Sequence, residues 1–426
     1  MTVAIFLGSL LAVMALGVPI AFSLLLCGVA LMWHLQLFDA QILAQNLVEG
    51  ANSFPLLAVP FFLLAGEIMN VGGLSRRIVD VAVAMVGHVR GGLGYVAIIA
   101  AVLLASLSGS AVADAAALTA LLLPMMSAAG HDKARSAGLI AAGGIIAPII
   151  PPSIGFVIFG VAANVSITKL FLAGIVPGLL IGASLWATWW WVSRRESVPV
   201  PKRKSLAEMM KALRESAWAM GLPLIILFGL RFGVFTPTEA AVVAAVYALF
   251  VATVIYREMK PRQIYGVLVS AAKTSSIIMF LVAAALVSSW LITVARIPAQ
   301  MVALLEPFMG NPTLLMIAIM VLVMAVGTAM DMTPTILIMT PVLMPVIKAA
   351  GIDPVYFGVL FIINNSIGLI TPPVGTVLNT VAGVGRVRMD DVTRGMLPFM
   401  WAEFAMMFLM VLFPWVVTGP ARWLGG

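Results

Sequence analysis

The sequence predicts an all-α polytopic membrane protein in which two inverted repeats each carry a re-entrant helical hairpin and a broken helix. Of its 426 residues, 62% are hydrophobic and 10% are charged, whereas a soluble domain is about 45–50% apolar and about 25% charged. The apolar stretches are continuous, so they predict spanning helices of about 20 residues rather than the alternating strands of a membrane β-barrel. An internal repeat and four paired breaks in the hydrophobic pattern predict the rest of the fold.

The polar composition argues against several function classes. The single cysteine, Cys27, excludes an internal disulfide, and the three histidines (His34, His88 and His131) have no metal-ligand spacing. The chain has no Walker A loop and no dinucleotide fingerprint, so we expect neither a cofactor nor an enzymatic activity. The net charge of +7 indicates basic cytoplasmic loops, and we expect no nucleic-acid partner.

The second half of the chain repeats the first at a constant offset and without gaps. The matched positions include Pro124 and Pro345, the pairs Pro151-Pro152 and Pro372-Pro373, and Gly174 and Gly395. This predicts two related halves, 55–180 and 276–401, joined over 181–275 by scaffold helices and a basic cytoplasmic connector. Residues 1–54 are predicted to be N-terminal membrane segments of the scaffold, and 402–426 the C-terminal end. Secondary transporters are often built from such repeats, with the binding site at the repeat interface.

The distribution of basic residues predicts that the two halves are inverted. The densest basic run lies between Arg194 and Arg214, which places this connector in the cytoplasm. Following the helices away from it puts Lys133 and Arg386 on the cytoplasmic side as well. The hairpin at 91–129 then opens inward, and the matching hairpin at 311–350 opens outward. Each hairpin is either two full spans or a re-entrant loop, and we favour the re-entrant loop because polar backbone at depth is tolerated where it lines a cavity.

Four polar stretches interrupt the apolar pattern: one at each hairpin tip, and one in the helix that follows each hairpin. They are Ala105–Asp114, Gly143–Ser153, Gly327–Thr335 and Asn364–Gly375. Proline removes an amide donor and blocks the preceding turn, so the broken helices leave backbone carbonyls without partners. Such carbonyls suit Na⁺, and the N-termini of the following half-helices suit an anion. The alternative is that glycine and proline only kink these helices, but the symmetry of the two pairs favours function.

A few ionisable residues interrupt the apolar stretches. An aspartate at the centre of a spanning helix costs about 2.5–3.5 kcal/mol to insert, so Asp331 at the second hairpin tip is predicted to be functional. For Asp114 the sequence leaves function and helix capping equally open. Glu67 and Glu239 lie near helix ends, where a structural role is favoured.

At these motifs the chain resembles the large membrane subunit of tripartite ATP-independent periplasmic (TRAP) transporters over essentially its whole length. The resemblance rests on Pro60–Met69, Ser108–Asp114, Pro148–Ser153, Phe235–Ala240, Asp331 with Thr333-Pro334, and Gly368–Gly375. It implies a Na⁺-driven importer of organic acids that works by an elevator-type movement in the bacterial inner membrane. It also implies two protein partners. One is a separate small four-helix subunit in the lipid bilayer, and the other is a periplasmic substrate-binding protein.

The resemblance further implies one Na⁺ site at each hairpin and broken-helix pair. Position by position, the inner site takes Ser106, Ser108, Ser110, Gly143 and Pro148, and the outer site takes Gly327, Thr328, Thr333 and Gly368. Asp331 matches an acidic position near substrate and ions, and the further coupling candidates are Ser153, Asn365 and Thr371. The main rival is a stand-alone sodium–dicarboxylate symporter, which needs no partners. An enzyme is disfavoured because no histidine lies in the four motifs, and a channel because inverted broken helices suit alternating access.

Overall fold

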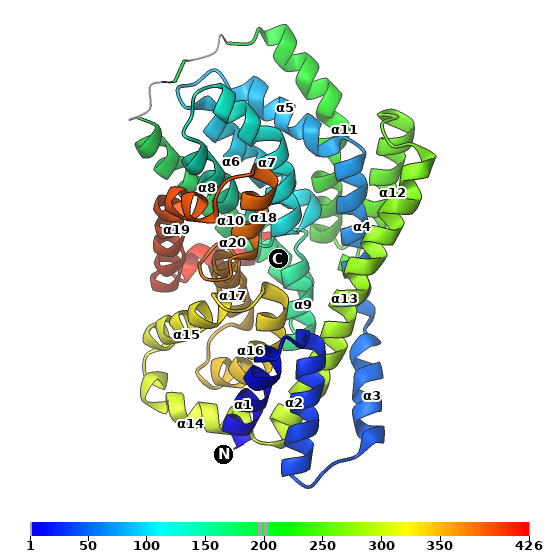
Figure 1. The fold of residues 1–426 in the computed structure, drawn as a ribbon, viewed down its shortest axis with the longest axis vertical. Coiled ribbons are helices and arrows are strands. Elements are labelled where there is room, and N and C mark those ends of the chain that lie inside the picture. The colour runs from blue at the N-terminus through cyan, green and yellow to red at the C-terminus, as the bar shows by residue number, and fades with distance from the viewer. Residues whose placement is uncertain (1, 195–197, 200–202, 426) are drawn as a thin grey trace.

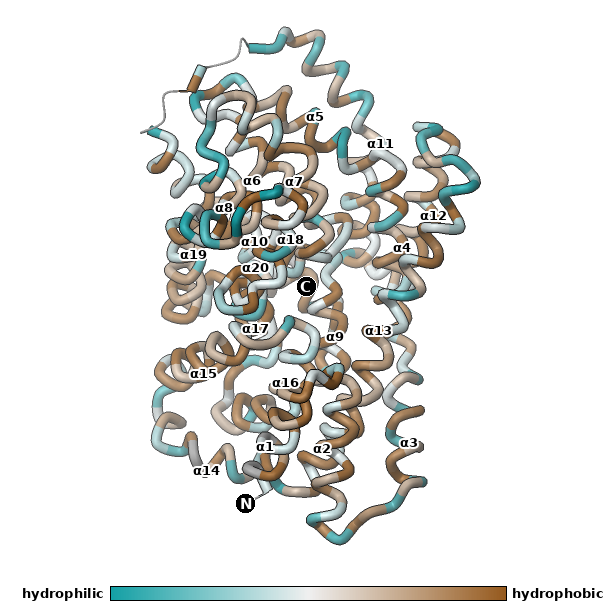
Figure 2. The backbone as a smooth tube through the Cα atoms, viewed as in Figure 1, coloured by the Kyte–Doolittle hydropathy of each residue, from teal (hydrophilic) through white to brown (hydrophobic). Residues whose placement is uncertain are grey.

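The computed structural model describes residues 2–194, 198–199 and 203–425, and this part of the chain contains helices and no strand. Eight of its helical segments are long and apolar enough to cross a membrane. The prediction of an all-α polytopic membrane protein is therefore confirmed. Hydrophobic residues colour most of the chain brown in Figure 2, whereas hydrophilic residues gather near its upper end and in the connecting loops.

The longest helix is α13 (Pro261–Val294), and the N-terminal helices pack along it. Its 34 residues correspond to about 51 Å, which exceeds the thickness of a bilayer core. It packs against α2 (Ile20–His34), α3 (Ala40–Ala51) and α4 (Ala58–Val71). Figure 1 shows this group along one side of the molecule. The remaining elements outside the repeats are α1 (Thr2–Ala15), η1 (Phe54–Leu57), α11 (Leu206–Arg231), α12 (Pro237–Phe250), η2 (Val251–Ile255) and α20 (Trp415–Gly425).

The internal repeat of the sequence recurs as two matched series of six helices. The first series is α5 (Leu74–Val86), α6 (Gly92–Ser108), α7 (Ala111–Ala128), α8 (Lys133–Gly144), α9 (Ile154–Ala163) and α10 (Ile167–Ser193). The second is α14 (Ile297–Met309), α15 (Pro312–Gly327), α16 (Met332–Ala349), α17 (Pro354–Gly368), α18 (Thr376–Gly385) and α19 (Met389–Leu412). Helices α7 and α16 begin and end at positions that the repeat matches to each other. Two pairs of matched prolines also lie inside matched helices. Pro124 of α7 corresponds to Pro345 of α16, and Pro177 of α10 corresponds to Pro398 of α19.

Each hairpin ends against the break in the helix that follows it. Gly109 turns the chain between α6 and α7 with a φ of +62°, and a Cβ there would clash with the carbonyl oxygen of Pro152. At the second hairpin, a Cβ on Gly368 would lie 2.9 Å from the carbonyl oxygen of Gly327. Glycine at these points lets two backbones approach to a distance that no other residue allows. The two tips therefore stop beside the interruptions of α8–α9 and α17–α18.

The two series are interlocked through the first half of each broken helix. At the start of α8, Ala134 lies so close to α19 that a Cβ on Gly395 would clash with its carbonyl oxygen. At the start of α17, a Cβ on Gly358 would be 2.9 Å from Leu170 near the start of α10. The first turns of α8 thus pack against the first turns of α19, and the first turns of α17 pack against those of α10.

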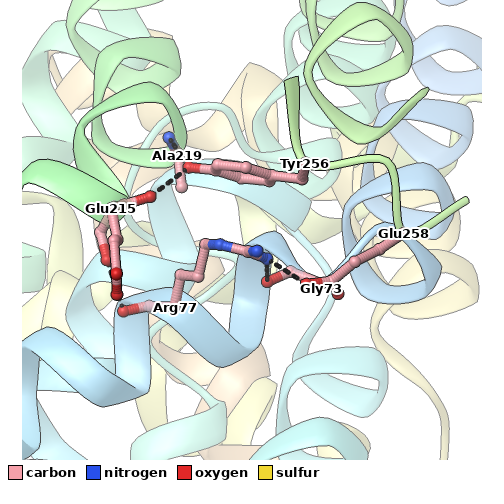
Figure 3. Close-up of polar contacts among 7 residues, drawn as sticks. Gly73, Arg77, Glu215, Ala219, Tyr256 and Glu258 are labelled. Carbon is pink, nitrogen blue, oxygen red and sulfur yellow. Dashed lines mark hydrogen bonds and ion pairs between the residues drawn. The ribbon is translucent and has the colours of Figure 1, made fainter. Parts of the chain in front are cut away.

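A polar cluster ties α5 to α11 and to the segment after α12. Arg77 Nη1 lies 2.7 Å from Glu258 Oε1, and its guanidinium lies 3.7 Å from the centre of the Tyr256 ring. The Tyr256 hydroxyl donates a hydrogen bond to the carbonyl of Glu215 (2.9 Å) and accepts one from the amide of Ala219 (3.2 Å). Figure 3 shows these side chains converging from three elements. A half-exposed ion pair contributes little alone, so the packed ring is the main contact.

Candidate ion and substrate site

The inner hairpin tip is organised around the carboxylate of Asp114. The Ser108 hydroxyl donates a hydrogen bond to Asp114 Oδ1 and accepts one from the amide of Ser110 at 3.2 Å. The helix cap of α7 is Ser110, whose hydroxyl accepts from the amide of Ala113 at 3.4 Å. Asp114 is therefore not the capping residue. It is 2% exposed, and its Oδ2 has no hydrogen-bond partner.

The break between α8 and α9 lies against both arms of this hairpin. A Cβ on Gly143 would lie 3.2 Å from Ala101 of α6, and one on Gly144 would lie 2.8 Å from Ala115 of α7. The Gly143 carbonyl accepts a hydrogen bond from Ile146 at 3.1 Å, and each carbonyl oxygen keeps a second lone pair for a cation.

Three more inner candidates have their polar atoms engaged locally. The Ser153 hydroxyl donates to the carbonyl of Pro148 and accepts from the amide of Phe156 at 3.1 Å, so it caps α9. The hydroxyl of Ser106 is turned back onto its own helix, where it donates to the carbonyl of Leu103 at 2.6 Å. Residues Ser106, Ser108, Ser110, Gly143, Pro148 and Ser153 thus lie at the hairpin or at the break beside it.

The outer hairpin and the break in α17–α18 bring together Gly327, Gly368 and Asn365. A Cβ on Gly327 would lie 3.7 Å from Gly368 and 3.9 Å from Asn365 Oδ1. Asn365 donates to the carbonyl of Phe361 at 2.8 Å, and its neighbour Asn364 donates to that of Met320 at 2.6 Å. Both asparagines are 1% exposed, and the Oδ1 of each has no partner. Buried amide oxygens seldom remain unpaired, so the Oδ1 of Asn365, which lies beside Gly327, suits a cation.

Asn364 is a residue that the sequence reasoning missed as a candidate. The sequence feature that could have indicated Asn364 is its position directly before Asn365 in the same break motif. Two threonines in the outer motifs donate back to the preceding turn, Thr328 to the Ala325 carbonyl (2.8 Å) and Thr371 to the Ile367 carbonyl (2.8 Å), and each hydroxyl oxygen keeps its acceptor capacity.

Asp331 lies at the N-terminus of α16, exposed, and facing the start of α18. Its Oδ1 accepts a hydrogen bond from the Thr376 hydroxyl at 3.4 Å. Asp331 and Thr333 also line a cavity of about 370 Å³. Its other wall is formed by Pro19 and the first residues of α2, together with Ile277, Ile278, Phe280 and Leu281 of α13. The second hairpin tip thus borders a space between itself and the N-terminal helices.

The remaining acids of the apolar stretches differ in their surroundings. Glu239 forms a capping box with Thr236, accepting from its amide at 2.7 Å, and Glu67 accepts from the Ser270 hydroxyl of α13 at 3.1 Å. Both carboxylates therefore have structural contacts. Glu403 in α19 is 0% exposed with no partner for either oxygen, and sequence reasoning gave it no role.

Besides the Asp114 carboxylate, the oxygens at the two sites belong to hydroxyl, amide and carbonyl groups. Among the described residues, no three His, Cys, Asp or Glu side chains gather as metal ligands. Neutral oxygens from unwound backbone are the ligands that membrane transporters use for Na⁺.

Comparison with known proteins gives one consistent result. Residues 7–416 match the family model described as tripartite ATP-independent periplasmic transporter, DctM component. The 2,3-diketo-L-gulonate TRAP transporter large permease protein YiaN of Escherichia coli (strain K12) is 57% identical over 424 residues, covering 100% of both chains. The C4-dicarboxylate TRAP transporter large permease protein DctM of Pseudomonas aeruginosa is 37% identical, covering 90% of each chain. The sialic acid TRAP transporter large permease protein SiaM of Vibrio cholerae is also 37% identical, covering 93% of each.

A solved structure shows the same fold at low sequence identity. The crystal structure of the YdaH transporter of Alcanivorax borkumensis superposes with a TM-score of 0.66 and 15% identity, covering 90% of each chain. At this identity the likeness concerns the fold alone.

Proposed function

The chain belongs to the tripartite ATP-independent periplasmic transporter family as its DctM component, and from this premise we propose that it is the large membrane subunit of a Na⁺-driven importer of organic acids. The observation that carries the proposal is the meeting of each hairpin tip with a broken helix, at Gly109 with Pro152 and at Gly327 with Gly368. The relatives are named for 2,3-diketo-L-gulonate, C4-dicarboxylates and sialic acid, all of which are organic acids. The proposed substrate is therefore a carboxylate.

The two helix series are inverted relative to each other in this proposal. The end of α18 lies at the start of α8, where Lys133 Nζ donates to the carbonyl of Arg386 at 3.4 Å. Parallel repeats would instead bring the start of α8 level with the start of α17. This contact supports inversion and joins the two basic stretches that the sequence assigns to the cytoplasm.

The two hairpins are re-entrant in this proposal. Helices α6 and α15 have 17 and 16 residues, which correspond to about 25 Å, and α7 and α16 have 18 each, which correspond to about 27 Å, so all four arms fall short of a bilayer core of about 30 Å. Because each tip stops at the interruption of a broken helix, each hairpin ends where that helix is partway across. The polar tip backbone then faces protein rather than lipid.

One Na⁺ binds at each hairpin and break. The inner site uses oxygens of Ser106, Ser108, Ser110, Gly143 and Pro148, and the outer site uses Gly327, Thr328, Thr333 and Gly368, with Asn364 and Asn365 adjoining it. The substrate carboxylate binds between the tips, with Asp331, Ser153 and Thr371 coupling it to the ions. Each Na⁺ entering gains about 2.3 kcal/mol per 100 mV of membrane potential, so two supply enough to drive accumulation.

The transport movement in this proposal is an elevator-type displacement of the hairpins and broken helices past the N-terminal helices. The cavity between Asp331 and α13 supports it, because loosely filled space there lets one group slide along the other. A small four-helix subunit braces the stationary helices in the bacterial inner membrane, and a periplasmic binding protein delivers the substrate. Family membership favours this three-component system over a stand-alone symporter.

Reconstitution into proteoliposomes tests the proposal. With the small subunit, a cognate binding protein and an inward Na⁺ gradient, labelled 2,3-diketo-L-gulonate should accumulate, with a C4-dicarboxylate and sialic acid as parallel candidates. Replacing Na⁺ by K⁺, or leaving out the binding protein, should each abolish accumulation. Uptake that persists in K⁺ contradicts sodium coupling, and uptake without the binding protein favours the stand-alone symporter.

A further inference from the structure

We propose that the cavity between α7 and the end of α18 is an anion-binding release site, where Lys133 and Arg386 hold a departing organic acid at the cytoplasmic face. The proposal rests on the proposed direction and class of transport, and it adds a second site to the one between the hairpin tips.

The first observation is the cavity itself. It has a volume of about 670 Å³ and lies between the second half of α7 and the last residues of α18. Its polar lining consists of the side chains of Lys133 and Arg386 together with Thr119 and Ser127. A space of this size accommodates a sugar acid or a dicarboxylate with water around it.

The second observation is the uncompensated charge of this lining. Within the part of the chain that the structure describes, neither Lys133 nor Arg386 pairs with a carboxylate, and the Lys133 ammonium only donates to the Arg386 carbonyl. Of the acids closest in sequence, Asp132 accepts from the Arg135 amide at 2.7 Å and Asp391 pairs with Arg388 at 2.9 Å, and within the described residues Asp390 forms no ion pair with either cation. Two like charges that line one hollow raise the local concentration of anions.

The third observation is a polar face on α18 that connects the hairpin tip with this cavity. Thr376, Asn379, Thr380, Gly383 and Arg386 lie on one side of the helix at spacings of three and four residues, and all are exposed or half-buried. The opposite side, which carries Val377, Leu378 and Val381, is buried.

This face points to water rather than to lipid. Exposed polar residues at membrane depth line an aqueous cavity, because lipid cannot satisfy them. The face begins where Thr376 bonds Asp331 and ends about 15 Å further on, at Arg386. Figure 1 shows α18 beside α7, with its end next to α8. An anion leaving the hairpin tip therefore meets a continuous polar surface that ends at two cations.

A charge-selective labelling experiment tests the site without relying on transport. Ser127→Cys is made in a Cys27→Ser background, and the complex is placed in inside-out membrane vesicles. Two thiol reagents of similar size are compared, the anionic sulfonatoethyl methanethiosulfonate and the cationic trimethylammonioethyl methanethiosulfonate. The ratio of their rates, divided by the ratio for free 2-mercaptoethanol, reports the potential at the cavity. We expect this normalised ratio to favour the anion by about threefold to tenfold.

Matched variants assign the effect to the two cations. Lys133→Gln and Arg386→Gln should each lower the ratio by about twofold or more, and the double variant should bring it near that of the free thiol. Lys133→Arg and Arg386→Lys should preserve it, and Lys204→Gln, which removes the same charge outside the cavity, should leave it unchanged. Choline chloride near 1 M should collapse the ratio, because the Debye length falls to about 3 Å while Na⁺ stays constant.

Uptake measurements separate this site from the proposed function. The double Gln variant should import labelled substrate about threefold more slowly, with the half-saturating concentration of loaded binding protein unchanged. A ratio equal to that of the free thiol, or one insensitive to the double variant, overturns the anion site. Normal uptake in a double variant that has lost charge selectivity overturns its role in release. If the charge-intact complex imports nothing, the proposed function fails, and the labelling ratio still decides whether the cavity binds anions.

Discussion

Gly109 and Gly368 have the same structural role at the two hairpin tips of the candidate site. Each occupies a point where a hairpin and a broken helix touch backbone to backbone. An added Cβ would clash with the Pro152 carbonyl at the first point and lie 2.9 Å from the Gly327 carbonyl at the second. A side chain at either point must push the tip off the break. The unpaired oxygens of Asp114, Asn364 and Asn365 lie in these hairpins and broken helices, so the glycines also set how closely candidate ligands approach.

Replacing Gly109 by alanine should destabilise the protein more than the same change at Gly130. Both residues have positive φ, +62° and +95°, which costs an L-residue about 1–2 kcal/mol. Only Gly109 also meets neighbouring backbone, since nothing lies within 4 Å of a Cβ on Gly130. Thermal unfolding in detergent should therefore show a larger fall in Tm for Gly109→Ala. Equal shifts for the two variants mean that the tip does not press on the break.

Asp331→Asn should reduce uptake at least tenfold while the protein still inserts in the membrane. The substitution removes a carboxylate at the second hairpin tip, and losing a charge eases insertion rather than hindering it. Initial uptake rates and the amount of protein in the membrane fraction measure the two effects separately. Glu239→Gln is the control: glutamine can keep the capping-box contact that Glu239 makes with Thr236, so uptake per folded molecule should stay near normal. Wild-type uptake by Asp331→Asn removes this residue from the mechanism.

At the scale of elements, the hairpin tips and the broken helices are the parts whose surroundings change in the proposed transport movement. The first hairpin comprises α6 and α7, the second α15 and α16, and the two belong to series that interlock through α8 with α19 and α17 with α10. In the proposed elevator-type movement, this interlocking moves the two hairpins as one group. Their tips should then exchange accessibility between the two sides of the membrane.

Single cysteines at the tips test this exchange. In a Cys27→Ser background, Met330→Cys should react faster than Ser110→Cys with an impermeant reagent added outside to the outward-facing protein. From the cytoplasmic side, the inward-facing protein should show the reverse order. The two positions are nearly equivalent, because Met330 directly precedes Asp331, which the repeat matches to Ser110. Labelling of both tips from one side, regardless of Na⁺, contradicts both inversion and the elevator-type movement.

At the scale of the whole molecule, any ion that binds only the folded protein adds to its stability. A ligand present at one hundred times its dissociation constant adds about 2.7 kcal/mol. Each proposed ion site lies between a hairpin and the broken helix that follows it, so an ion bound there ties the two together. Ion binding should therefore appear as a change in global unfolding.

Na⁺ should raise the Tm of the detergent-purified protein above its value in equal concentrations of K⁺. Above the dissociation constant, the difference in Tm should keep growing with the logarithm of the Na⁺ concentration, as binding linkage requires. Asn365→Ala should reduce the Na⁺-specific increase, because it removes an unpaired buried oxygen beside Gly327. Thr418→Ala near the C-terminus, whose hydroxyl only donates to the Pro414 carbonyl, is a control that should keep the increase. Identical melting curves in both salts contradict the sodium sites.

The sequence alone determined the membrane class, the repeat and the four break motifs, because these depend on local properties. Continuous apolar runs make helices wherever they lie, and proline ends a helix through its own missing amide. The same reasoning predicted a role for Asp331 and placed Lys133 and Arg386 on one side. It left Asp114 undecided and assigned no role to Asn364 or Glu403. Only the tertiary structure decided that Ser110, not Asp114, caps α7, and that two asparagine oxygens remain unpaired. Hydrogen-bond partners and cavities depend on which distant segments meet, and in this chain such meetings join residues as far apart in sequence as Lys133 and Arg386.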